Sequence, residues 1–370
     1  MTISSKFSDG AFVTSFGRSG TGKTVGDIAS FPNAVVCAGT REFKPAMTVL
    51  GWQPPYVLEV KTLFDVEDAV YSVLKARKQK NKLALSIDAM LADDISVLSY
   101  QTEKALAEGS IPKNRLADKR GSGYSPWTNQ KDATLTLVFR CAEVLRQEGM
   151  HLATNGHLRV ARTDKNGKHI RGGIDLPMDL TEGFCAGTNL MARMLPEPER
   201  LFFQTIFSIE NNGSEWATKN QFGLPALVPS NMRELLNVAG YKLSRGRGLE
   251  AHEEYVEQIA QAIDAVIGMG PYSRAALSEV LKGPRAHLET LVPDPRHVRW
   301  ILRDASDRAL IRREAHRSIL GDLDAKPATG SAAAFPGQVA PAVFPGAQPQ
   351  LALPAPAPAP VVAFAFPANK

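Results

Sequence analysis

An eight-residue segment near the N-terminus constrains this 370-residue chain more than any other feature: Gly17-Arg18-Ser19-Gly20-Thr21-Gly22-Lys23-Thr24. It matches the pattern G-x-x-x-x-G-K-S/T, in which glycines let backbone N–H groups curl round phosphate oxygens. In such a loop Lys23 contacts the β- and γ-phosphates of a nucleoside triphosphate, and the Thr24 hydroxyl contacts Mg²⁺. The segment therefore predicts a site for ATP and Mg²⁺.

The residues on either side of the segment support this interpretation. The β-type run Ala11–Phe16 leads directly into it, and Val25–Ala29 can continue as a helix. The N-terminus of such a helix favours a bound phosphate. The alternative is a glycine-rich turn with an incidental lysine, which needs neither a strand before it nor a helix after it.

From Ala11 to about Arg245, short β-type runs alternate with longer helical patterns. This alternation is typical of an α/β fold with a mainly parallel sheet flanked by helices. The expected elements are strands at Ala11–Phe16, Ala34–Ala38, Leu83–Ile87, His151–Asn155 and Leu201–Ile209, and helices at Val66–Lys78 and Thr134–Gln147.

A second module is expected after the glycine-containing break Leu243–Gly248. Helical periodicity between Glu253 and Leu320 predicts three or four helices. Within them, Arg296–Arg303 mixes apolar positions with arginines, as the recognition helix of a winged-helix or helix-turn-helix unit does. A helical cap with a solvated basic face is the alternative.

Alanine and proline dominate from Pro327 onward, which predicts a disordered tail that could contact another protein. The expected domains are a core at 1–245, a helical module at 250–322 and the tail at 323–370.

Composition adds limits on location and partners. No apolar run approaches the roughly 18–20 residues that span a bilayer, and Met1–Phe7 lacks the layout of a secretory signal. We therefore expect a cytoplasmic protein without a membrane segment. Cys37, Cys141 and Cys185 are far apart, which predicts buried small side chains rather than a zinc site or disulfides. The net charge of +5 favours polyanionic partners only weakly.

Asp88 is the carboxylate expected to hold Mg²⁺ through its water shell, because it follows the apolar run Leu83–Ile87. It could instead cap a helix that begins at Ala89. The next residue is Ala89 rather than glutamate, which argues against ATPases that carry a catalytic glutamate directly after this aspartate.

With these features in order, the chain resembles the RecA-like P-loop ATPases, and among them the phage-encoded ATPases of single-strand annealing and recombination. The resemblance covers about Phe12–Lys242 and implies the cytoplasm of the host as the location of a phage-encoded chain. Its further motifs are Phe31-Pro32-Asn33-Ala34, Ser86-Ile87-Asp88, Asn155-Gly156-His157, Asp164-Lys165-Asn166-Gly167 and Lys219-Asn220-Gln221-Phe222-Gly223-Leu224-Pro225.

The resemblance also implies roles for individual residues. Glu42 is the candidate for the glutamate that polarises the attacking water, although a surface glutamate is the alternative. Asn155 or His157 would sense the γ-phosphate, unless His157 is an ordinary loop histidine. Lys219 corresponds to the finger that reaches the nucleotide of the next subunit in a homo-oligomeric ring or filament. Gln221 departs from the Lys-x-Arg pair of the related proteins.

Two basic segments are candidate sites for single-stranded DNA, because cations neutralise phosphates and aromatic rings stack on bases. Solvated hairpins are the alternative. The first segment, Lys113–Lys131, contains Lys119 and Arg120 among its cations. The cations of the second are Arg159, Arg162, Lys165, Lys168 and Arg171.

Two functional hypotheses follow. The first is an ATPase that acts on single-stranded DNA in phage recombination, annealing or replication. The second is a nucleotide-gated assembly or adaptor protein with little or no hydrolysis, which the displaced Glu42 and the departure at Gln221 would favour.

Overall fold

The computed structural model describes residues 10–38, 46–51, 54, 56–111, 132–163, 165, 167, 169–176, 180–196, 205–209, 216–224, 227–241, 243, 253–268 and 274–320. The chain divides into two units, Met1–Gly321 and Asp322–Lys370, and every described element belongs to the first. The predicted tail lies outside the described residues. None of the described helices is long and apolar enough to cross a membrane.

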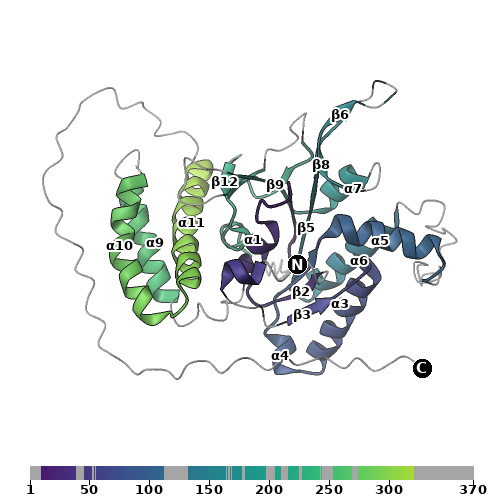
Figure 1. Cartoon of the computed structure of the whole chain (residues 1–370), viewed down its shortest axis with the longest axis horizontal. Coiled ribbons are helices and arrows are strands. Elements are labelled where there is room, and N and C mark those ends of the chain that lie inside the picture. Colours follow the sequence, from purple (N-terminus) through teal and green to yellow (C-terminus); the bar gives the residue numbers. More distant parts are fainter. Residues whose placement is uncertain are drawn as a thin grey trace, which may run out of the picture. The chain divides into compact units, whose positions relative to one another are not determined.

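A ten-stranded sheet forms the centre of the first unit (Figure 1). Its strands follow the order β12-β10-β9-β1-β5-β4-β2-β3, with β11 paired to β9 and β8 to β5. The pairs among β1, β2, β3, β4, β5 and β9 are parallel, whereas β8, β10, β11 and β12 pair in antiparallel fashion. The bounds are β1 (Phe12–Gly17), β2 (Ala34–Ala38), β3 (Tyr56–Glu59), β4 (Ala89–Asp93), β5 (His151–Arg159), β8 (Gly173–Ile174), β9 (Leu190–Pro196), β10 (Thr205–Ser208), β11 (Lys219–Asn220) and β12 (Leu227–Pro229).

Helices cover both faces of this sheet, because its strands carry apolar side chains on both sides. Along β1, Phe12 and Phe16 join one buried cluster and Val13 joins another, the pattern of a sheet buried on two faces. One cluster includes side chains of α3, α5, α6 and α7, and the other includes side chains of α1 and α8. The bounds are α1 (Lys23–Ser30), α3 (Leu63–Lys78), α5 (Ile95–Ala107), α6 (Asp132–Gln147), α7 (Leu180–Gly187) and α8 (Met232–Val238).

Most of the elements expected from the sequence are confirmed. β1 and β2 lie at the predicted strands, α3 and α6 at the predicted helices, and β5 begins at His151 but continues to Arg159. β10 lies inside the predicted Leu201–Ile209, of which 201–204 are outside the described residues. The three cysteines are free and buried, as expected.

The predicted strand Leu83–Ile87 is wrong. The short helix α4 (Lys82–Leu85) stands there, because the Asn81 side chain accepts hydrogen bonds from the backbone N–H groups of Leu83 and Ala84 and so caps it. Leu85 is 51% exposed, unlike a side chain of a central strand. The buried strand of this region is β4, which begins at Ala89, four residues after the end of α4.

The C-terminal part of the unit consists of α9 (Glu253–Gly268), α10 (Arg274–Leu291) and α11 (Pro295–Leu320). Their apolar faces form a third buried cluster of their own. Pro295 takes the first helical position of α11, where its missing N–H costs nothing, and the Asp294 side chain accepts from the Arg296 N–H. Across 253–268 and 274–320 the structure contains helices and no strand, so these residues contain no β-wing.

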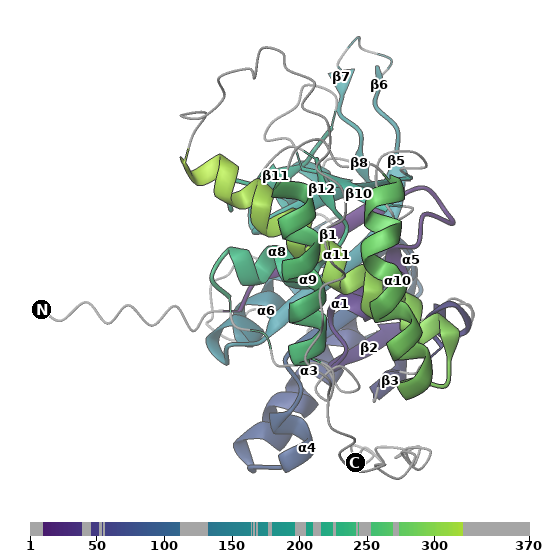
Figure 2. The same cartoon turned by 90° about the vertical axis from the view of Figure 1, so that its left-hand side faces the viewer.

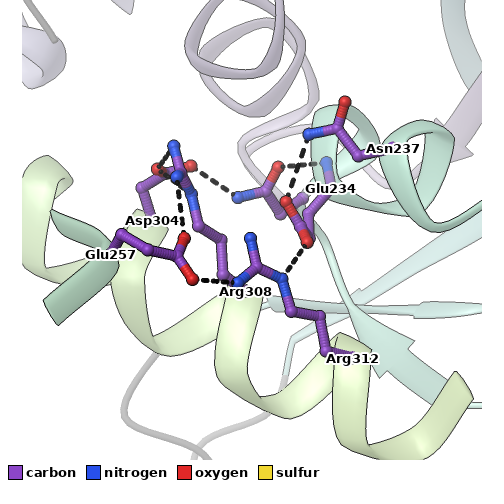
Figure 3. A network of polar contacts seen from close by, with 7 residues as sticks. Glu234, Asn237, Glu257, Asp304, Arg308 and Arg312 are labelled. Atoms are coloured by element: carbon purple, nitrogen blue, oxygen red, sulfur yellow. Dashed lines mark hydrogen bonds and ion pairs between the residues drawn. The ribbon is translucent and has the colours of Figure 1, made fainter. Parts of the chain in front are cut away.

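A polar network joins α11 to α8 and α9 (Figure 3). The Arg312 guanidinium donates to Glu234 of α8 at 2.7 Å and to Glu257 of α9. Glu234 has a side chain that is only 3% exposed, and charge-assisted bonds to a buried carboxylate hold their geometry firmly. Asp304 accepts from Asn231, the N-cap of α8, at 2.9 Å. The network therefore fixes α11 to α9 and to α8, a helix that packs on the sheet.

Candidate functional site

The predicted phosphate loop, Gly17–Thr24, leaves β1 at Gly17 and continues into α1, whose first residue is Lys23. Gly20 and Gly22 have φ angles of 79° and 83°, a conformation that residues with a side chain adopt only with strain. Lys23 is buried, and its Nζ donates to the carbonyl oxygens of Gly17 at 3.2 Å and Arg18 at 3.1 Å. Its charge therefore lies at the N-terminus of α1, where a bound anion is stabilised.

A cavity of about 1050 Å³ opens beside this loop. Every loop residue from Arg18 to Thr24 lines it, together with residues at the carboxyl ends of β4, β5 and β9 and on α11. Ligand sites typically occupy about 300–1,000 Å³, so the cavity is large enough for a nucleotide.

Two neighbouring carboxylates, Asp93 and Asp94, line the cavity at the carboxyl end of β4. β5 separates β4 from β1 in the sheet, and all three strands are parallel. The end of β4 and the phosphate loop therefore meet at one edge of the sheet. Both carboxylates are nearly buried, at 4% and 3% exposed. Oxygen ligands suit Mg²⁺, so Thr24 and Asp93 fit a metal bound beside the loop.

The structure does not bring Asp88 to the loop. Asp88 directly precedes β4, and its carbonyl accepts from the N–H of His151, the first residue of β5. It thus lies at the amino edge of the parallel strands, on the order of 16 Å of strand away from Asp93. The prediction that Asp88 binds Mg²⁺ is wrong because the strand follows Asp88 rather than preceding it. A helix N-cap is wrong too, since Ala89–Asp93 is a strand.

His157 reaches the cavity from β5, where it pairs in register with Gly17 of the phosphate loop. Its Nε2 lies 3.2 Å from Oδ2 of Asp94. Burial raises the pKa of the Asp94 carboxyl, and nearby His157 and the charge of Lys23 oppose that rise. The pair can hold a proton between its carboxylate and imidazole at the edge of the cavity.

Asn155 lies below the loop rather than in the cavity. Its Nδ2 donates to Oδ2 of Asp27 on α1 at 3.0 Å, and Ser15 of β1 donates to the same carboxylate at 3.2 Å. Burial raises the pKa of Asp27 to about 7, against opposing hydrogen bonds from Asn155 and Ser15. Asn155 therefore ties β5 to α1, while His157 occupies the position at the cavity.

The second basic segment forms a hairpin beyond β5. β6 (Arg162–Thr163) pairs with β7 (His169–Ile170) in antiparallel register, and Figure 2 shows both strands extending past β5 and β8. Arg162 and Lys165 are exposed, whereas Arg159 is half-buried and donates to the Leu176 carbonyl. Arg171 follows β7 and is half-buried. Lys168 lies outside the described residues.

The remaining candidates are dispersed. Glu42, Lys119 and Arg120 lie outside the described residues. Lys219 begins β11, where its Nζ donates to the carbonyl of Ala186 at the end of α7. Burial lowers its pKa. Lys219 does not line the cavity beside its own phosphate loop, so its predicted role on a neighbouring subunit's nucleotide stays a prediction.

Two arginines of the predicted recognition helix make contacts to the rest of the unit. Arg296 donates to the Thr48 carbonyl at 2.7 Å, and Arg303 donates to Ser230 Oγ at 2.6 Å. Arg296 and Arg299 are both exposed, and Arg299 takes no part in these contacts. The contacts are those of a helical cap on the core rather than of a helix presented to a DNA groove.

The described residues thus have the α/β fold with a mainly parallel sheet flanked by helices that the sequence predicted, and the Gly17–Thr24 loop lies at the carboxyl edge of the central strand β1. Among solved structures, the chain is similar to a KaiC-like protein from the hyperthermophilic archaeon Pyrococcus horikoshii, with a TM-score of 0.29 and 14% identity. The similarity covers 54% of this chain and 77% of that one. No protein-family model and no curated protein matches the sequence.

Proposed function

We propose that this chain binds ATP with Mg²⁺, hydrolyses it, and couples the nucleotide to single-stranded DNA. The observation that carries the nucleotide part is the shared cavity: the phosphate loop, the carboxylates Asp93 and Asp94, and His157 all line it. An anion-binding loop facing two acidic groups suits a metal-bound phosphate, because a free phosphate would be repelled by them.

Individual residues take separate tasks at this site. Lys23 and the loop backbone bind the β- and γ-phosphates, and Thr24 and Asp93 hold the metal. Mg²⁺, when bound, neutralises charge that develops on the phosphate oxygens. Asp93 takes the place that the sequence assigned to Asp88.

We assign Asp94 and His157 to the attacking water, as the groups that accept its proton. In hydrolysis, water oxygen bonds to the γ-phosphorus, the bond to the bridging oxygen breaks, and ADP and inorganic phosphate form. The water's proton goes to the Asp94–His157 pair. A raised carboxyl pKa makes Asp94 a stronger proton acceptor than an ordinary aspartate. Glu42, the base that the resemblance implies, lies outside the described residues and remains the alternative.

The DNA part of the proposal is supported by the course of β5. The same strand carries His157 in the cavity and, two residues later, ends at Arg159 before the β6–β7 hairpin. Exposed cations on the hairpin can neutralise phosphates. His157 and the hairpin belong to one continuous stretch of the chain. A movement of His157 that follows a change at the γ-phosphate is therefore passed along the backbone to the hairpin.

The resemblance to the annealing and recombination ATPases extends this proposal to phage recombination and to an assembly of several subunits. In such an assembly Lys219 acts on the nucleotide of the neighbouring subunit.

Phosphate release measured with and without single-stranded DNA tests the proposal. We expect stimulation by DNA in the unaltered chain and its loss in the Arg162→Ala/Lys165→Ala double variant. The matched control is Lys75→Ala/Lys78→Ala, which removes two exposed cations from α3. Release that DNA never stimulates would favour the nucleotide-gated adaptor instead.

A further inference from the structure

Two side chains of α11, Trp300 and Arg303, line the cavity that contains the phosphate loop. They come from the helical part of the chain, about 280 positions after the loop in sequence. Neither has a role in the nucleotide site described so far. Their place in the cavity calls for a ligand group other than the phosphates.

The Trp300 ring is held from two sides. Its Nε1 donates to the Val49 carbonyl at 3.3 Å. The guanidinium carbon of Arg303 lies 4.6 Å from the ring centre, within the range of a cation–π interaction. Arg303 in turn donates to Ser230 Oγ, and its side chain is only 14% exposed. An aromatic ring so restrained loses little freedom when a ligand contacts it.

The cavity also differs in chemistry from one part to another. Its two carboxylates, Asp93 and Asp94, and the His157 imidazole lie at the ends of β4 and β5. Trp300 is accompanied by apolar side chains from the loop helix and the segment after β2, namely Val25, Ala46 and Val49. A metal-bound phosphate tail suits the first part of the cavity, and a flat apolar ring system suits the part around Trp300.

The helix that carries Trp300 is fixed to the core and cannot be treated as a remote domain. Arg312 binds Glu234 of α8, and Asp304 binds Asn231, as Figure 3 shows for the labelled members of this network. The apolar Ile311 of α11 also belongs to the cluster beneath α1 and α8. The position of Trp300 beside the loop is therefore built into the fold.

We propose that Trp300, with Arg303 over its ring, forms the base-binding wall of the nucleotide site. The purine of the bound nucleotide stacks on this wall while its phosphates lie in the loop. The proposal deepens the proposed nucleotide binding and rests on it. The proposal also assigns α11 a role in nucleotide binding, because without α11 the site has no base-binding wall.

Equilibrium binding of two probes, Mg·ATP and Mg·inorganic triphosphate, tests this wall in the full-length chain. The unaltered chain should bind ATP more tightly than inorganic triphosphate by about tenfold, the scale of a base–aromatic stack. Trp300→Ala should weaken ATP binding by about the same factor and leave inorganic triphosphate unchanged. Trp300→Phe, which keeps an aromatic face, should retain most of the ATP affinity. Tyr100→Ala is the control, because Tyr100 is 64% exposed on α5 and outside the cavity.

The outcomes separate this inference from the proposed function. If the unaltered chain binds neither probe, nucleotide binding itself fails and the base wall fails with it. If ATP binds but Trp300→Ala and Trp300→Phe match the unaltered chain, the wall is wrong and the phosphate site stands. Equal losses for both probes would also overturn it, because they would mean that the substitution disturbs the loop. The comparison of the two probes in the unaltered chain needs no variant and holds even if Trp300→Ala fails to fold.

Discussion

The carboxyl edge of the sheet and the β6–β7 hairpin present their charges in opposite ways. At the sheet edge Lys23, Asp93 and Asp94 are all less than 10% exposed. On the hairpin, Arg162 and Lys165 are exposed. The first set lies in a low-dielectric region, where each charge acts strongly on its neighbours. The second set lies in water and salt, where single charges act weakly.

Because of this difference, substitutions in the two regions should have different effects. A substitution at the sheet edge removes a charge that nothing else replaces, and its effect on the nucleotide should be large. A substitution on the hairpin should leave the fold intact and change only the salt-dependent part of DNA binding. Four predictions test the contrast, beginning with the largest effect.

Lys23→Ala should reduce ATP binding or turnover by at least about 100-fold, since one charge-assisted contact to phosphate in a desolvated site is worth several kcal/mol. Nucleotide titration and phosphate release measure it. Lys104→Ala, on the exposed face of α5, is the matched lysine control. Full activity in Lys23→Ala would remove the nucleotide site from this loop.

Asp93→Asn and Asp88→Asn should differ sharply, although one removes the last residue of β4 and the other the residue directly before it. Asp93→Asn should raise the Mg²⁺ concentration needed for ATP turnover by about tenfold or more, because it removes an anionic oxygen from the metal site. Asp88→Asn should leave that concentration unchanged, since Asp88 lies at the other end of the strand. Equal Mg²⁺ titrations for the two variants would contradict the assignment to Asp93.

Arg162→Ala/Lys165→Ala should lower the salt slope of single-stranded DNA binding by about 1.4, which is about 0.7 for each DNA phosphate that the variant no longer neutralises. Because both side chains are exposed, the melting temperature and ATP affinity should stay unchanged. Fluorescence titration at several salt concentrations measures the slope. An unchanged slope would assign DNA binding to another surface, for which Lys113–Lys131 is the remaining sequence candidate.

The substitution expected to affect the ligands least is at Asp27 under the phosphate loop, and its effect is on stability. Burial raises its pKa from 3.8 to about 7, so between about pH 4 and 7 the folded chain keeps a proton that the unfolded chain has lost. Its contribution to stability is therefore lost as pH rises through this window, with a slope of up to about 1.4 kcal/mol per pH unit. Asp27→Asn should remove this share of the slope in urea unfolding followed from pH 4.5 to 7.

Asp294 supplies the control for that measurement. Its hydrogen bond from Arg296 lowers its pKa to about 2, so Asp294→Asn should change the pH dependence of stability only below about pH 4. Above that pH it shifts stability by a constant amount and leaves the slope between pH 4.5 and 7 unchanged. An Asp27→Asn slope equal to that of the unaltered chain would mean that Asp27 is charged in the folded state throughout this window.

Several elements could be predicted because their signals are local. The loop needs its glycines within eight residues, β1 and β2 are short β-type runs, and α3 shows an apolar period over its own length. The acidic strand was missed although its signal was present: Ala89-Met90-Leu91-Ala92 is a buried apolar run followed by two aspartates. The preceding run Leu83–Ile87 is as apolar, and only the Asn81 cap turns its start into a helix.

The sequence by itself determined the phosphate loop, the alternation of strands and helices, and the positions of the basic segments. The tertiary structure decided which carboxylate faces the loop, because strand order and direction bring the end of β4, not its start, to the end of β1. It also decided that Trp300 and Arg303 line the loop's cavity. The physical reason is range: glycine conformation and apolar period act between neighbours in the chain, whereas a cavity is made by packing residues hundreds of positions apart.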